Sequence, residues 1–148
     1  MPGSMMLARR IKDAVIPATT GVMASHPTGN QTSVTLTSAT SLEGGAGTAG
    51  AYVQIVPVST ITSEFRITSV VVSAFESATR YTIEIATGLA ASEVSIGSFC
   101  VEAGATTHSH VVPVSMANIP ANTRVIMRSA VQTGNDQTCT IAINYVTV

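Results

Sequence analysis

The residues best suited to metal chemistry in this sequence are His108 and His110, two positions apart in a polar run. On an extended segment such a pair projects to one side, so both imidazoles could ligate one ion. A metal site needs a third or fourth ligand, and no cysteine or carboxylate follows at a suggestive spacing. Unless a symmetry axis brings copies together, we expect polar, exposed histidines, with no metal and no cofactor.

The residue patterns typical of hydrolases are also weak. No serine stands in a G-x-S-x-G turn, and the Gly-rich stretch at 44–50 lacks the Lys-Ser/Thr ending of a phosphate loop. Glu84 and Glu93 flank a short loop, but a glycosidase needs two carboxylates across a cleft that holds sugar. Aromatic residues form 4% of the chain and Trp is absent, which disfavours a sugar cleft or a lectin site. We expect no enzymatic activity.

Two arginines share one face of an expected strand. Side chains two or four positions apart point to the same side of a strand, and Arg124 and Arg128 are four positions apart. They either pair with acids such as Glu84 on a solvated sheet or form a contact surface for an acidic partner. Both alternatives stay open at the level of sequence.

The N-terminal segment, residues 1–30, is expected to form an arm with a short helix at 5–15. Prolines and glycines predict no regular structure over 17–30. The arm either frays or reaches an acidic neighbouring subunit. Nucleic acid is not an expected partner, because three cations without interleaved aromatics release few counterions. The residues expected to contact a partner are Met6, Leu7, Arg9, Arg10, Ile11, Lys12, Val15, Arg124 and Arg128.

The composition is poor in charge. Charged residues make up 10% of the chain and hydrophobic residues 45%, with a formal net charge of -1; typical globular proteins carry about 25% charged residues. Charge depletion is typical of interface cores, so a subunit covered by neighbours is favoured over a charge-poor domain that stands alone. No apolar run approaches the roughly 20 residues of a membrane span, and we expect no membrane partner.

Alternating segments separated by turn residues predict an all-β fold. With about eight such strands and no helical period of useful length, residues 31–148 are expected to form a single antiparallel β-sandwich, a jelly roll; an up-and-down barrel is the rival. The expected strands are 32–37, 51–58, 65–74, 80–87, 93–102, 110–115, 123–131 and 137–147.

Residues 119–146 read as two strands joined by a turn at Gly134–Asp136, and we expect an antiparallel pair there. Cys139 begins the apolar face of the second strand, and Cys100 lies inside an earlier one. Both cysteines are expected to be buried thiols, because no secretory context favours a disulfide.

Three segments, in order, resemble the recurring pattern of small jelly-roll virion proteins of tailed bacteriophages. Residues 51–58 carry an aromatic residue and an aliphatic run; 81–93 end in Gly and a small-small-Ser-Glu turn; 119–128 contain an Ile-Pro-Ala-x-Thr-Arg corner. The sequence departs from the pattern at Tyr52, where Trp is expected, and at Asn122, where Gly is expected.

The resemblance implies a structural role without catalysis. Its first implication is a capsid decoration or cement protein that binds and stabilises the assembled head. The alternative is a tail, neck or fibre component with a receptor-binding β-sandwich. The implied partners are further copies of the chain, as a homotrimer, and the major capsid protein or other virion subunits. The implied location is the virion, assembled in the bacterial cytoplasm.

Overall fold

The computed structural model describes residues 23–26, 34–38, 49–104, 109–134 and 136–148. Within these residues the chain forms nine β-strands and no helix. All eight strands expected from the sequence are present, and one strand precedes them. The strands are β1 Met23–His26, β2 Val34–Thr37, β3 Val53–Val56, β4 Phe65–Ser73, β5 Arg80–Thr87, β6 Val94–Glu102, β7 His110–Pro113, β8 Val125–Val131 and β9 Thr138–Thr147.

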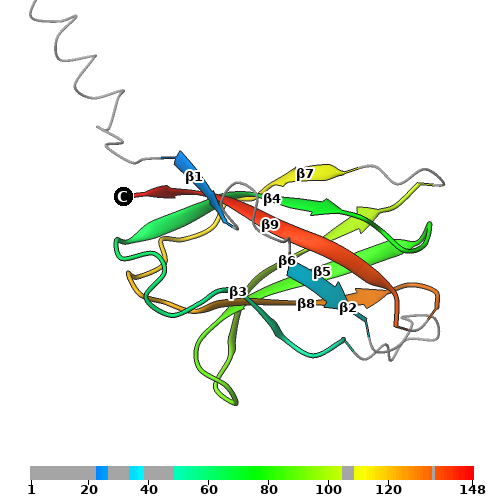
Figure 1. Ribbon diagram of the computed structural model, residues 1–148, viewed down its shortest axis with the longest axis horizontal. Coiled ribbons are helices and arrows are strands. Elements are labelled where there is room, and N and C mark those ends of the chain that lie inside the picture. The colour runs from blue at the N-terminus through cyan, green and yellow to red at the C-terminus, as the bar shows by residue number, and fades with distance from the viewer. Residues whose placement is uncertain (1–22, 27–33, 39–48, 105–108, 135) are drawn as a thin grey trace, which may run out of the picture.

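The strands form two antiparallel sheets that face each other (Figure 1). Sheet A has β1 and β2 on one side of β9, followed by β4 and β7. Sheet B has the order β3-β8-β5-β6. The prediction of an all-β chain with the character of an antiparallel sandwich is therefore confirmed.

Alternate residues of both sheets build the core between them. In β9, Cys139, Ile141 and Ile143 are fully buried, as the alternation in the sequence predicts. From sheet B, Tyr81 and Ile83 join them in one apolar cluster. Each strand therefore contributes its inward face to a shared core, which is the main stabilising contact between the sheets.

The expected antiparallel pair of residues 119–146 is wrong. The two runs are β8 and β9, and they lie in different sheets: β8 pairs with β3 and β5, whereas β9 pairs with β1, β2 and β4. The segment between them, with Gly134 at a positive φ of 90°, carries the chain from one sheet to the other. Alternation is the same for strands that face each other across a core as for strands that pair side by side, so the pattern alone favoured the wrong neighbour.

The expectation of no regular structure over 17–30 is wrong for Met23–His26. These residues form β1, whose Met23 lies opposite Val146 and whose His26 lies opposite Ile143 of β9. β1 satisfies the backbone of β9 beyond the end of the short β2. Residues 1–22 and 27–33, which include the expected helix at 5–15, lie outside the described residues, so the arm stays a prediction.

Two fully buried serines differ in how their hydroxyls are satisfied. Ser38 donates its hydroxyl to the carbonyl of Gln137 at 3.3 Å and accepts the Gln137 amide at 3.1 Å, which ties the end of β2 to the turn before β9. Ser129 points into the core from β8, and its hydroxyl has no hydrogen-bond partner among the described residues.

This difference predicts opposite effects of one substitution. Ser129→Ala removes an unpaired buried hydroxyl, and its free energy of unfolding should equal that of the wild type or exceed it by up to about 1 kcal/mol. Ser38→Ala removes both hydrogen bonds of a fully buried hydroxyl, although the Ser38 amide still donates to the Gln137 carbonyl, and should cost about 1–2 kcal/mol. Urea unfolding of both variants measures the difference, and a larger loss for Ser129→Ala would contradict the assignment.

Candidate functional site

The largest set of interacting charged side chains in the described residues lies on the outer face of sheet B. We call it the outer-face cluster. Adjacent strands bring its members together. Glu84 of β5 lies opposite Arg128 of β8, and Gln54 of β3 lies opposite Ile126 of β8. The cluster consists of Tyr52, Gln54, Glu84, Glu93, Arg124 and Arg128.

Glu84 is the centre of one half of the cluster. Arg128 donates from Nε to its Oε2 at 2.6 Å, and the Tyr52 hydroxyl donates to its Oε1 at 2.9 Å. The guanidinium carbon of Arg128 also lies 4.3 Å from the centre of the Tyr52 ring, within the range of a cation–π contact. These three side chains therefore hold one another in a fixed arrangement.

Arg124 organises the other half. It donates from Nε to Gln54 Oε1 at 3.0 Å and from Nη1 to the carbonyl of Gly88 at 3.2 Å. The Glu93 carboxylate lies 3.9 Å from the same Nη1. Gly88 has a positive φ of 114°, and a Cβ there would meet the carbonyl of Ser92 at 2.6 Å. A glycine is therefore required where this loop offers its carbonyl to the arginine.

A small apolar patch lies on the same face of sheet B as the outer-face cluster. Ile126 and Ala86 are opposite one another on β8 and β5, and both are fully buried although they lie outside the main core. Ile126 shares its side of the sheet with Arg124 and Arg128, so the aliphatic stems of the two arginines are its nearest available cover. Part of the role of these arginines is thus packing.

The electrostatics of the cluster favour the ionised state of Glu84. Burial by itself would raise the pKa of Glu84, but hydrogen bonds from Arg128, Tyr52 and Ser95 outweigh burial and hold this pKa below its ordinary value. Burial and the hydrogen bond to Glu84 raise the pKa of Tyr52, so the phenol stays protonated and remains a donor. A general acid needs a raised carboxyl pKa, so Glu84 is unsuited to that role.

The structure places the two strand arginines on one face, as predicted, and gives each a carboxylate partner. Pairing with Glu84 was one of the two alternatives for Arg128, and the geometry agrees with it. The sequence pattern offered Glu84 as a possible arginine partner, but it offered Glu93 only as a catalytic acid and did not predict its contact with Arg124. Tyr52 and Gln54 were missed, because only the register of β3 against β8 brings them near Arg124 and Arg128.

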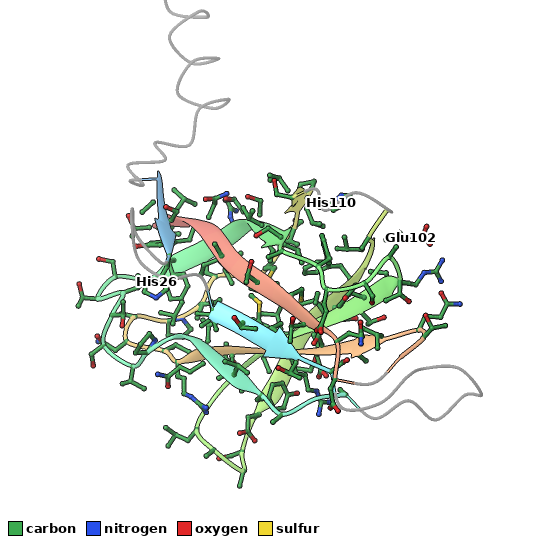
Figure 2. All side chains as sticks on the ribbon, turned by 45° about the vertical axis from the view of Figure 1, so that its right-hand side comes forward. His26, Glu102 and His110 are labelled. Atoms are coloured by element: carbon green, nitrogen blue, oxygen red, sulfur yellow. The ribbon has the colours of Figure 1, made fainter. Side chains whose placement is uncertain are left out.

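The described histidines lie apart from each other. His26 lies on β1, at one edge of sheet A, and His110 on β7, at the other edge, and both His110 and Glu102 are well apart from His26 (Figure 2). His26 is half-buried, and burial lowers its pKa although a backbone hydrogen bond with Ile55 acts in the opposite direction. His110 packs edge-on against Phe75, with ring centres 5.6 Å apart. His108 lies outside the described residues, and across the described part of the chain no three His, Cys, Asp or Glu residues are grouped as metal ligands would be.

The two cysteines are both free thiols, and they differ in exposure. Cys139 is buried, and burial raises the pKa of its thiol to about 12. Cys100 is exposed on β6, so its predicted burial is wrong. The reason is that even-numbered residues of β6 follow Thr82 and Glu84 onto the outer face, where nothing in the described chain covers them.

A hollow of about 320 Å³ lies at the end of β6, beside Arg80 and Glu102. Two shallow hollows border the part of β6 that contains Ile96. One, of about 260 Å³, lies between Ile96–Phe99 and Pro113–Met116; the other, of about 230 Å³, lies between Ile96 and residues 116–120. Both are smaller than the roughly 300–1,000 Å³ typical of small-molecule sites. They mark the side of the sandwich where β6 and β7 are the outer strands of their sheets.

The predicted partner contacts stay a prediction. Arg124 and Arg128 lie in the outer-face cluster, whereas Met6, Leu7, Arg9, Arg10, Ile11, Lys12 and Val15 lie outside the described residues.

Within the described chain there is no helix of a length and hydropathy that would cross a bilayer. Comparison with protein-family models, curated proteins and solved structures finds no match for this chain.

The geometry predicts that Glu84→Gln weakens the fold. The variant loses the carboxylate that binds Arg128, and because both side chains are partly exposed we expect a cost of about 1 kcal/mol in the free energy of unfolding. Glu102→Gln is the matched control: its partner Arg80 is half-exposed, and Glu102 itself is 72% exposed, so no measurable loss is expected. Equal losses for both variants in urea unfolding would contradict the special place of Glu84.

The lowered pKa of Glu84 also predicts a pH dependence. A carboxyl whose folded pKa lies below its ordinary value of 4.5 stabilises the fold above that value, and the contribution disappears as pH falls through the folded pKa. The difference in stability between wild type and Glu84→Gln should therefore be largest near neutral pH and shrink in acid. Unfolding curves over this range measure it. A difference that grows as pH falls would overturn the assignment.

Proposed function

We propose that this chain is a non-enzymatic structural subunit of a bacteriophage virion, namely a capsid decoration or cement protein that binds and stabilises the assembled head. One observation carries the proposal beyond the sequence resemblance: the outer face of sheet A has a broad area without charge. We call this area the neutral face. Its residues are Ser25, Thr35, Ser69, Val71, Ser73, Val111, Pro113, Thr140, Ala142 and Asn144.

The polar groups of the neutral face are largely satisfied by one another. The hydroxyls of Ser73 and Thr140 lie 2.8 Å apart, and Thr140 also donates to the Ser73 carbonyl at 3.1 Å. Asn144 donates from Nδ2 to the hydroxyl of Ser69 at 2.8 Å. A face whose hydrogen bonds are already made loses little when water is removed, which suits a protein–protein contact.

The apolar members of the neutral face point to the same role. Val71 is half-buried and Val111 is 64% exposed, and they lie opposite one another on β4 and β7. Such valines gain stability when a neighbouring subunit covers them. The charges of sheet B, by contrast, are mostly engaged within the chain. This distribution supports a subunit that presents sheet A to its assembly.

The strand order supports the jelly roll within this proposal. β2 pairs with β9, β3 with β8, β4 with β7 and β5 with β6. This nested pairing is what results when one long hairpin of eight strands winds into two sheets, the arrangement of a jelly roll. β1 is then an addition that continues sheet A along β9.

The proposed partners are the major capsid protein or other virion subunits and further copies of the chain, as a homotrimer, within the virion. A subunit that binds only the assembled shell lowers the free energy of that state by mass action. Loss of the shell's stability without the subunit would then follow from binding alone and needs no catalysis. The N-terminal segment is proposed as a second anchor through its positive charges.

Co-sedimentation with capsids that lack the protein tests the proposal. Wild type should bind saturably, and Val111→Lys should reduce binding at least about tenfold, because a lysine buried in the contact loses its hydration. Val94→Lys is the matched control, since Val94 is 62% exposed but lies on β6, outside the neutral face. A chain that starts at Gly21 tests the N-terminal anchor separately.

The outcomes separate the two virion roles. Equal binding of both lysine variants would exclude the neutral face as the contact. No binding by the wild type would overturn the decoration role. Adsorption of the same protein to host cells would then favour the tail, neck or fibre alternative.

A further inference from the structure

The outer strands of the two sheets differ in length. β1, β2, β3 and β7 have four residues each, and short outer strands are a common protection against pairing with other chains. β6 is the outer strand of sheet B and has nine residues. Residues 94–101 contain no charge and no proline, and beyond the β-bulge at Ile96 the segment 97–101 lacks the usual features that keep an edge unpaired.

The register shows which backbone groups of β6 are free. The amide of Ala103 donates to the carbonyl of Thr79 at 3.0 Å, and this pair begins the ladder of β6 with β5. In an antiparallel ladder the direction alternates, so Val101 and Phe99 also turn their backbone groups toward β5. Ser98, Cys100 and Glu102 therefore turn their N–H and C=O groups outward. Nothing in the described chain pairs with this side of β6.

We propose that this edge pairs antiparallel with β6 of a second copy of the chain about a two-fold axis at Cys100. In this register Cys100 lies opposite Cys100 of the second copy, and Ser98 lies opposite Glu102. The outward N–H and C=O groups of Ser98, Cys100 and Glu102 then face the outward groups of the same three residues in the second copy. Each opposed pair exchanges two backbone hydrogen bonds. The β-bulge at Ile96, where the register against β5 shifts, ends the segment that can pair.

The side chains on the inner side fit the same register. Phe99, half-buried at the rim of the core, lies opposite Val101 of the second copy, which makes two aromatic–β-branched pairs across the axis. Gly97 lies opposite Ala103 of the second copy, beside the hollow of about 260 Å³ that Gly97 and Phe99 help to line. The small side chain of Ala103 can lie opposite Gly97 beside this hollow. In the dimer, apolar side chains on the inner side of one β6 would therefore contact those of the other.

The charges at the ends of the segment are compatible with a second copy as the occupant. Glu102 already binds Arg80 of its own chain, and its new neighbour Ser98 is neutral. Self-pairing about a two-fold axis also uses both edges at once and closes, so it leaves no further long edge exposed among the described strands. This contact through β6 is separate from the three-fold contact that the proposed homotrimer needs. A strand of a different protein would need a similar length and a similarly uncharged sequence to pair with β6. The β6 strand of a second copy has both properties.

Cys100 provides a direct test on the purified full-length chain. Opposed residues of a hydrogen-bonded pair have Cα atoms about 5.5 Å apart, within the range of a disulfide. Mild oxidation with diamide should therefore convert the wild type into a covalent dimer of twice 15.2 kDa. Cys100→Ser should abolish this product, because Cys139 is buried. Persistence of the covalent dimer in Cys100→Ser, or its absence from the wild type, would overturn the proposal.

Two further variants in the Cys100→Ser background test the register. Ser98→Cys alone should give no covalent dimer, because the two copies of residue 98 lie four positions apart along the strands, about 13 Å. Ser98→Cys with Glu102→Cys should restore the covalent dimer. The opposite pattern would show a different register and overturn the axis at Cys100.

Proline substitutions separate the edge from the fold. Ser98→Pro removes an outward N–H and should leave the cooperative unfolding transition in place while native mass spectrometry shows loss of the dimer. Phe99→Pro removes an N–H directed at β5 and should damage the fold itself. A folded Ser98→Pro protein that still dimerises would contradict the proposal. Because none of these measurements uses capsids, the dimer can stand or fall separately from the proposed virion role.

Discussion

The pairing of β9 with three other strands is the constraint on which the rest of the structure depends. β9 bonds to β1 and β2 on one side and to β4 on the other, so it joins the beginning, the middle and the end of the chain in sheet A. Its inward residues Cys139, Ile141 and Ile143 are fully buried. Backbone pairing and apolar burial act on the same strand. Loss of either would remove the strand that joins β1 and β2 to β4 in sheet A.

The two outer faces of the sandwich divide the polar residues between them. Sheet B carries arginines and glutamates that bind one another on the same outer face as the buried Ile126 and Ala86. Sheet A carries short hydroxyls and an amide that bond among themselves. The first arrangement stabilises the isolated chain in water, whereas the second lowers the cost of removing water. A chain with few charges can in this way stay folded and still keep one face suited to contact.

The edges of the sheets follow a similar division. On one side of the sandwich, β2 and β3 lie close to each other. Between them, the Gly50 amide donates to the carbonyl of Ser129 in sheet B at 2.8 Å. A Cβ at Gly50 would collide with the carbonyl of Thr37 in sheet A, so the glycine allows this close approach. On the other side, shallow hollows separate β6 from β7 and from the segment 114–120 that follows β7. The closed side is complete within one chain. The open side combines a long strand, free backbone groups and half-buried apolar residues such as Phe99, and these features belong to an edge that gains from a partner.

The sequence by itself determined the number and place of most strands, because alternation of apolar and polar residues is a local property. It also placed Arg124 and Arg128 on one face and offered pairing with acids such as Glu84 as one of two alternatives. Tertiary structure decided which strands are neighbours: β8 and β9 separate into different sheets, Met23–His26 becomes a strand, and Cys100 is exposed. It also brought Tyr52 and Gln54 to the arginines. The physical reason is that alternation fixes which side of a strand is buried, whereas hydrogen-bond register and the packing of two sheets decide what lies beside it.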